Sequence, residues 1–398
     1  MIEITNFRQG AILNHNHGIE TEKSLKIRIR GISETGRPVK INGTPAIMDG
    51  RFFHCDVELT KKFNTVTASV MTPYGTFSQE LILLWDKKSF KRFNCYIDDH
   101  IFLFTELARQ RPKKAFDHFY LAGLKKIHEE TGLKVTLKTF FRHDHDPAGF
   151  LLSETPDTWK SEFEAESDWL KFSFHAYSEF PDRPYLEATA EEFGRDWDLV
   201  QNEIIRIAGE SSYITPMIIH WGNIHSVVAQ EYVRRGGRYY GRSMRPSVMG
   251  GPSLADRQKG GNMEETFKKV AAGDQRIAAT EGLQLYYDDQ EEIDYLNHHK
   301  AYYNPGLNLT IMLGTVCCNL LTQDMIRERI AKNLELHDQY GVEAFNFASH
   351  EQYSFPSYIN YIPDHLERIG LTARLFKEAG YKPVFFPQGF MGNTAWEE

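Results

Sequence analysis

Two adjacent carboxylates, Asp98 and Asp99, are the feature of the sequence with the clearest chemical potential. They end the apolar run 93–97, where two like charges repel each other unless they share a cation or a proton. One carboxylate could ligate a metal ion while its neighbour accepts a proton from bound water. Two other interpretations stay open: a solvated strand end, or a cap on a helix over 101–109, whose first turn an Asp would stabilise.

His175 and Glu179 form a second candidate pair, four residues apart, after the run 171–174. A single helical turn would place both side chains on one face, a spacing that lets an imidazole and a carboxylate share an ion. Pro181 shortens any helix here. A strand-end histidine with an unrelated surface glutamate is therefore another open interpretation.

His350 follows the run 345–349 and has a carboxylate, Glu351, directly after it. A histidine in this place could donate a proton to a leaving group, with its tautomer set by Glu351, Asp98 or Asp99. A buried histidine bonded to a backbone carbonyl is the alternative.

Polar and aromatic residues also follow other predicted strands. Flat rings with polar tips suit the faces of sugars, although most of the 13% aromatic residues are expected to fill the core. His220 and Trp221 could contact and stack on a sugar, or they could form a pair in the core. The residues expected to line a sugar cleft are His220, Trp221, Arg142, Tyr177, Tyr353 and Asp289.

The elements that must position these residues alternate between short apolar runs and amphipathic helical segments from about residue 89. This alternation predicts parallel strands joined by helical crossovers. About seven or eight such units predict an α/β fold, a distorted (β/α)7–8 barrel over 89–398, whose chemistry lies at the C-terminal ends of the strands. The segment 242–281 fits no unit and predicts an inserted active-site loop.

Residues 1–88 show a different pattern. Leu25, Ile27 and Ile29 alternate with charged residues, a period of two that buries one face of a strand. Turn signals separate several such runs, for example Asn42-Gly43 and Asp49-Gly50. The region therefore predicts a small all-β sandwich of the immunoglobulin-like type.

Composition narrows the class of partner. The net charge is −8, and the basic residues are scattered, which argues against a nucleic-acid surface. No apolar run approaches the eighteen or so residues that span a bilayer, and the first residues lack the pattern of a signal peptide, so no membrane and a cytoplasmic location are expected. Four cysteines without metal-site spacing suit a reducing compartment. The oligomeric state stays open.

At these residues the chain resembles the polysaccharide deacetylase (NodB-homology) family. Asp98 and Asp99 occupy the place of that family's Asp-Asp pair. The family's His-x-x-x-His motif reads His175 to Glu179 here, with a carboxylate in place of the second histidine. The apolar strand that ends at His350 is similar to the family's last motif, whereas the family's Arg-x-Pro stretch has no counterpart at 218–222.

The resemblance implies a distorted barrel that removes an N- or O-acetyl group from a carbohydrate with the help of a divalent ion. Asp99, His175 and Glu179 would hold zinc, manganese or magnesium. Asp98 would be the base and His350 the acid, with Glu351 beside it.

Two other classes of protein stay open. A glycoside hydrolase would use two carboxylates among Asp98, Asp99, Asp289 and Glu351 without a metal. A non-catalytic homologue would bind carbohydrate through the same cleft.

Overall fold

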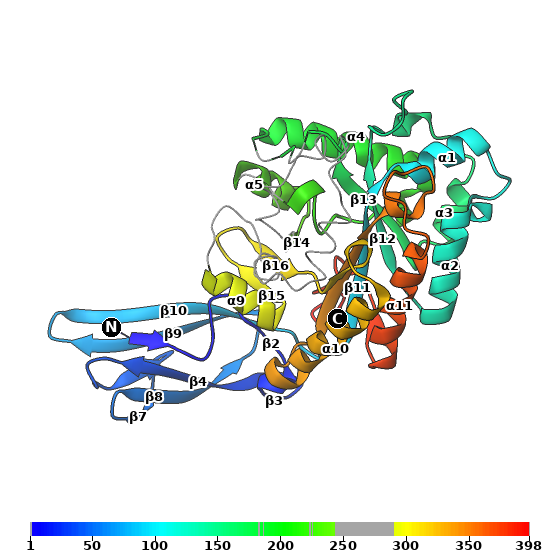
Figure 1. The fold of residues 1–398 in the computed structure, drawn as a ribbon. Helices are drawn as coiled ribbons and strands as arrows, with labels where there is room; N and C mark the ends of the chain where they lie inside the picture. The colour runs from blue at the N-terminus through cyan, green and yellow to red at the C-terminus, as the bar shows by residue number, and fades with distance from the viewer. Residues whose placement is uncertain are drawn as a thin grey trace.

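The computed structural model describes residues 2–181, 184–185, 187–222, 224, 226–242 and 290–397. It shows a mixed α/β protein with several sheets, in which an all-β part adjoins a larger α/β part (Figure 1). The predicted loop from residue 243 onward, and Asp289 with it, lie outside the described residues.

The N-terminal part consists of two five-stranded sheets around one apolar core. Strand β4 alternates strictly, so Leu25, Ile27 and Ile29 are buried, as the period of two predicts. The immunoglobulin-like topology stays a prediction. The first sheet has the order β1 (Ile2–Ile4), β4 (Leu25–Ser33), β8 (Phe52–Leu59), β7 (Ile47–Asp49), with β3 (Gly18–Glu20) on β4; the second has β2 (Ile12–Leu13), β10 (Gly75–Trp85), β9 (Phe63–Thr72), β5 (Val39–Ile41), β6 (Thr44–Pro45).

The C-terminal part is built on a parallel sheet that follows the order β13-β12-β11-β18-β17, with β19 also paired to β11. A separate three-stranded sheet has the order β14-β16-β15. In the described ranges these two sheets do not close into a ring, so the barrel stays a prediction. The strands are β11 (Arg92–His100), β12 (Val135–Phe140), β13 (Leu170–Ala176), β14 (Tyr239–Arg242), β15 (Ala301–Asn304), β16 (Leu309–Leu313), β17 (Val316–Cys317), β18 (Ala344–His350) and β19 (Lys382–Pro383).

Helices follow the strands and cover the large sheet. Strand β11 is buried along its whole length, and Phe93, Cys95 and Ile97 join the main core with the helices. Tyr96 instead packs with Ile218 and Ala348 in a small separate cluster. No helix of the described residues is long and apolar enough to cross a bilayer. The helices are α1 (Phe102–Gln110), α2 (Phe119–Thr131), α3 (Lys160–Ala165), α4 (Ala190–Ala208), α5 (Ser226–Arg234), α9 (Gln290–His299), α10 (Gln323–Tyr340) and α11 (His365–Glu378).

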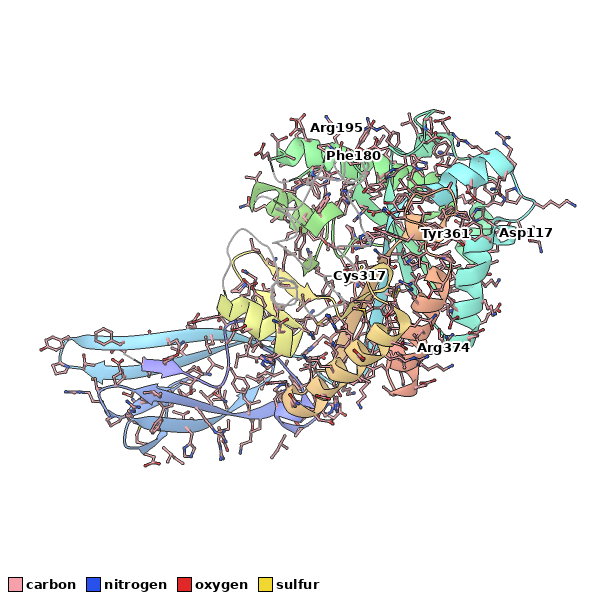
Figure 2. All side chains as sticks on the ribbon, viewed as in Figure 1. Asp117, Phe180, Arg195, Cys317, Tyr361 and Arg374 are labelled. Carbon is pink, nitrogen blue, oxygen red and sulfur yellow. The ribbon has the colours of Figure 1, made fainter. Side chains whose placement is uncertain are left out.

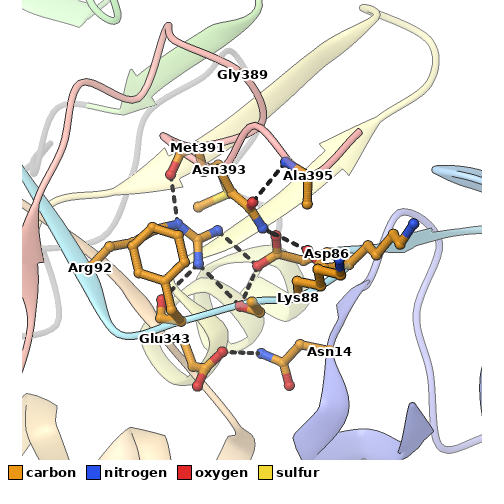
Figure 3. A network of polar contacts seen from close by, with 12 residues as sticks. Asn14, Asp86, Lys88, Arg92, Glu343, Gly389, Met391, Asn393 and Ala395 are labelled. Atoms are coloured by element: carbon orange, nitrogen blue, oxygen red, sulfur yellow. Dashed lines mark hydrogen bonds and ion pairs between the residues drawn. The ribbon is translucent and has the colours of Figure 1, made fainter. Parts of the chain in front are cut away.

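A buried polar network joins the two parts of the chain (Figure 3). Arg92, the first residue of β11, forms an ion pair with Asp86 at 2.7 Å, and its side chain is fully buried. Asn393 donates to Asp86 at 2.9 Å, and Arg92 donates to the carbonyl of Met391 at 2.6 Å. The C-terminal segment therefore closes over the junction between the sandwich and the strand that carries the aspartate pair.

Replacing Asp86 with alanine should destabilise the protein strongly. Removing one partner of a buried ion pair leaves the other charge unpaired, which costs about 3–5 kcal/mol. Urea unfolding of Asp86→Ala measures this loss. The control is Asp56→Ala, which removes the exposed ion pair with Arg28 and should change stability far less. Equal losses of unfolding free energy in the two variants would contradict a stabilising role for the buried pair of Asp86 and Arg92.

Candidate metal centre

The centre begins at an irregularity in β11. The pairing of β11 with β12 shifts register between Ile97 and His100, and Asp99 has a φ of 68°, in the left-handed region. A bulge of this kind re-aims side chains, and Asp is among the few residues that tolerate the conformation. As a result the two neighbouring carboxylates meet different partners: Asp98 meets Lys138, and Asp99 meets two histidines.

Three side-chain atoms converge at Asp99. Its Oδ1 lies 3.0 Å from His175 Nε2 and 3.5 Å from His220 Nδ1, and these two nitrogens are 3.3 Å apart. Zinc bonds of about 2.0–2.1 Å at tetrahedral angles separate neighbouring donor atoms by about 3.3–3.4 Å. All three residues are buried. In the described part of the chain, no other group of three or more His, Cys, Asp or Glu side chains converges closely enough to hold a metal ion. The donor set therefore fits a divalent ion.

Hydrogen bonds orient this donor set. His220 Nε2 donates to the backbone carbonyl of Glu179 at 2.9 Å, so Nδ1 of a neutral His220 presents its lone pair to the centre. Gln352 Nε2 donates to Asp99 Oδ2 at 2.8 Å, which leaves Oδ1 to face the histidines. Such outer contacts are typical of metal-binding residues because they fix the tautomer and the direction of the ligand.

The charges around the centre favour an ionised Asp99. Burial opposes the charged form, but the nearby histidines His350, His175 and His220 outweigh it and hold the pKa of Asp99 well below its usual range. Burial lowers the pKa of His175. Burial also acts against a charged His220, but Asp99 and Glu179 outweigh it and raise its pKa. Without an ion, His220 is thus the imidazole that favours a proton.

Glu179 does not place its carboxylate among the converging atoms. The chain leaves β13 at Ala176 and continues without a helical turn, so the spacing of four residues does not bring Glu179 beside His175. Its Oε2 lies 3.9 Å from His145 Nε2 instead. The ligand set with Glu179 stays a prediction, and the geometry favours His220 in the third position.

Glu351 is engaged by helix α1. Its Oε2 accepts the backbone N–H groups of Ile101 and Phe102 at 2.7 and 2.8 Å, and its Oε1 accepts that of Leu103 at 2.9 Å. The residue is fully buried, and burial raises its pKa to about 8 although the three N–H groups favour the charged form. Glu351, and not the aspartate pair, thus accepts the free N–H groups at the start of α1. A catalytic role for Glu351 stays a prediction that this position does not favour.

His350 stands at the end of β18, in register with Asp98 on the neighbouring strand. Its Nδ1 donates to Asn319 Oδ1 at 2.9 Å. The same oxygen lies 3.3 Å from Ser349 Oγ and 3.2 Å from Cys317 Sγ, both of which can donate to it. The tautomer of His350 is therefore set by an amide oxygen, and Nε2 is left for other contacts.

The residues predicted to contact substrate lie in different environments. Arg142 bonds Asp144 at 2.6 Å and covers the ring of Tyr177 at 5.5 Å. Tyr353 is buried and packs against Tyr358, whereas Trp221, next to His220, is partly exposed with a left-handed φ of 65°. Phe180, which follows Glu179, lies on the part of the molecule away from the sandwich (Figure 2).

Three residues with clear roles in this geometry were missed from the sequence: Lys138, Asn319 and Gln352. Lys138 offered a signal, because a charged residue within a buried strand is rare unless it is paired. Asn319 and Gln352 are ordinary amides in short 3-10 helical segments, and their types alone carry no such signal.

The comparisons with known proteins are distant. No family model and no curated protein matches the chain. A crystal structure of a mutant CE4 family pseudoenzyme is similar with a TM-score of 0.29 and 10% identity, over 85% of this chain and 88% of that one. A putative α-galactosidase from Bacteroides fragilis gives a TM-score of 0.27 and 10% identity, over 94% and 78%. Likenesses of this size identify no family. The fold and the site by themselves define a mixed α/β protein with a candidate Asp-His-His metal centre.

Metal content distinguishes the ligand set that contains His220 from the one that contains Glu179. We expect Asp99→Ala and His220→Ala to lose bound zinc after dialysis, because each removes a converging donor atom. Gln352→Leu should weaken affinity by about 10–100-fold through loss of orientation. Glu179→Gln should keep the metal. Elemental analysis of the loaded proteins measures the zinc content. Loss of zinc from Glu179→Gln with retention of zinc in His220→Ala would favour the ligand set Asp99, His175 and Glu179.

A buried histidine beside this region makes stability depend on pH. His365 bonds Ser349 Oγ through Nε2 at 2.5 Å and Ser354 Oγ through Nδ1 at 2.6 Å. Burial lowers its pKa to about 3. Between pH 6.5 and this value, His365 takes up a proton in the unfolded chain but not in the folded one, so a falling pH favours unfolding.

The contribution of His365 is at most about 1.4 kcal/mol per pH unit in that window. Urea unfolding of wild type and His365→Gln between pH 7 and pH 5 should show a shallower loss of stability in the variant. Parallel curves for the two proteins would contradict the assignment.

Proposed function

We propose that the chain is a metal-dependent hydrolase that removes an N- or O-acetyl group from a carbohydrate. The observation that carries the proposal is the convergence of Asp99, His175 and His220 beside a second carboxylate, Asp98. The substrate class rests on the resemblance of the motifs around Asp98, Asp99 and His350 to polysaccharide deacetylases. The distorted barrel and the immunoglobulin-like domain belong to the same proposal.

Asp99, His175 and His220 would hold the ion. A divalent ion, when bound there, supplies Lewis acidity toward an acyl oxygen and toward water. Two imidazoles and one carboxylate are a softer set than the one with Glu179, which moves the preference from manganese or magnesium toward zinc.

The remaining steps are proton transfers by residues of this chain. Asp98 accepts the proton of the attacking water. His350, which carries a proton on both ring nitrogens at this step, donates the one on Nε2 to the departing amine or alkoxide. The two residues are register partners on adjacent strands, so they flank the same short stretch of the sheet edge. The hydrogen bond from Nδ1 to Asn319 keeps the ring of His350 in one orientation.

The carboxylates needed by the glycoside hydrolase alternative have other partners. Asp99 faces two histidines, and both oxygens of Glu351 accept backbone N–H groups. No contact of the described residues favours that reaction over deacetylation.

Acetate release tests the proposal. The zinc-loaded chain should release acetate from N-acetylglucosamine oligomers or acetylated xylan, and a chelator should abolish the release. Asp98→Asn should lower kcat by about 10²–10⁴-fold with unchanged zinc content. Asp168→Asn, the same change at an exposed position, should leave kcat unchanged.

Other outcomes identify the alternatives. Shortened saccharides with no acetate would indicate a glycoside hydrolase. Saccharide binding without any product would indicate a non-catalytic binding protein.

A further inference from the structure

Lys138 is a buried charged residue that has no role in the reaction steps proposed above. It lies within β12, its side chain is fully buried, and its Nζ is 3.1 Å from Asp98 Oδ1. The same ammonium lies 3.5 Å from the centre of the Tyr96 ring. Carboxylate and ring together replace part of the water that the charge gives up.

The register of the sheet creates this contact. Tyr96 pairs with Thr136 and Ile97 with Leu137, so the next residue of β12, Lys138, stands beside Asp98, inside the register shift. Burial lowers the pKa of Lys138 to about 8, against the opposing effect of Asp98. The side chain is therefore still mainly charged at neutral pH.

The position of this pair suggests a role in orientation. A buried ion pair is weak evidence for stability, because apolar side chains of similar size often serve a core as well or better. Asp98 also neighbours the candidate centre, since Asp99 with its histidines is the next residue along the chain, and a divalent ion bound there would add positive charge. A freely rotating Asp98 carboxylate would be attracted toward that centre.

We propose that Lys138 is a positioning residue, whose ammonium holds the Asp98 carboxylate in the orientation of a proton acceptor and apart from the metal ligands. The inference rests on the proposed function, because it takes Asp98 as the base. The contact itself is a property of the fold and can be tested without any turnover.

Crystal structures of the full chain test the orientation. In Lys138→Met the Asp98 carboxylate should rotate away from its wild-type position, and in Lys138→Arg it should stay. An unchanged carboxylate in Lys138→Met would overturn the inference, whether or not the wild type releases acetate. A wild type that releases no acetate from any saccharide would overturn the proposed function alone.

Kinetics on an acetylated saccharide that the wild type hydrolyses test the consequence. Lys138→Met should lower kcat roughly 100-fold, the effect of a misplacement of about 1 Å, with unchanged KM and zinc content. Lys138→Arg should recover at least a tenth of the wild-type kcat. A kcat of Lys138→Met within a few-fold of wild type would overturn the inference.

A double variant separates positioning from general damage to the fold. In an Asp98→Asn background, adding Lys138→Met should cause no further loss of kcat, because the group that Lys138 positions is already removed. Additive losses would overturn the inference. Should Lys138→Met fail to fold, Lys138→Arg alone decides, and a loss of kcat above tenfold with intact zinc content would overturn the inference.

Discussion

The bulge at the end of β11 is the constraint on which the candidate site depends. In a regular strand, successive side chains point to opposite faces of the sheet. Here the register shift and the left-handed conformation of Asp99 give two neighbouring carboxylates separate partners. A backbone conformation of this kind costs of order 1–3 kcal/mol and persists where surrounding contacts over-determine it. The hydrogen bonds of Asp99 to His175 and Gln352 are such contacts.

Three buried carboxylates lie close together, and their partners distinguish their roles. Asp98 faces an ammonium, Asp99 faces two imidazoles and an amide, and Glu351 accepts the free N–H groups of a helix. Like charges this near to one another are stable only when each has its own compensation. Each carboxyl group at this edge of the sheet therefore has its own partners, and among the described residues only Asp99 shares a common centre with other donor atoms.

The same strand connects this centre with the rest of the molecule. Arg92 at the start of β11 is held by Asp86 from the end of the sandwich and by the carbonyl of Met391 from the C-terminal segment. Asn393 adds a bond from that segment to Asp86. The strand is thus anchored at one end by a buried ion pair and carries the candidate site at the other.

The sequence by itself determined which strand ends are polar and the alternation of β4, because these depend on neighbours in the chain. Only the tertiary structure decided that His220 rather than Glu179 meets Asp99 and His175. The spacing rule behind Glu179 assumes a helical turn, and the chain after β13 has none. The cap by Glu351 and the pairing of Lys138 likewise depend on strand order and register, which bring together residues that no local pattern relates.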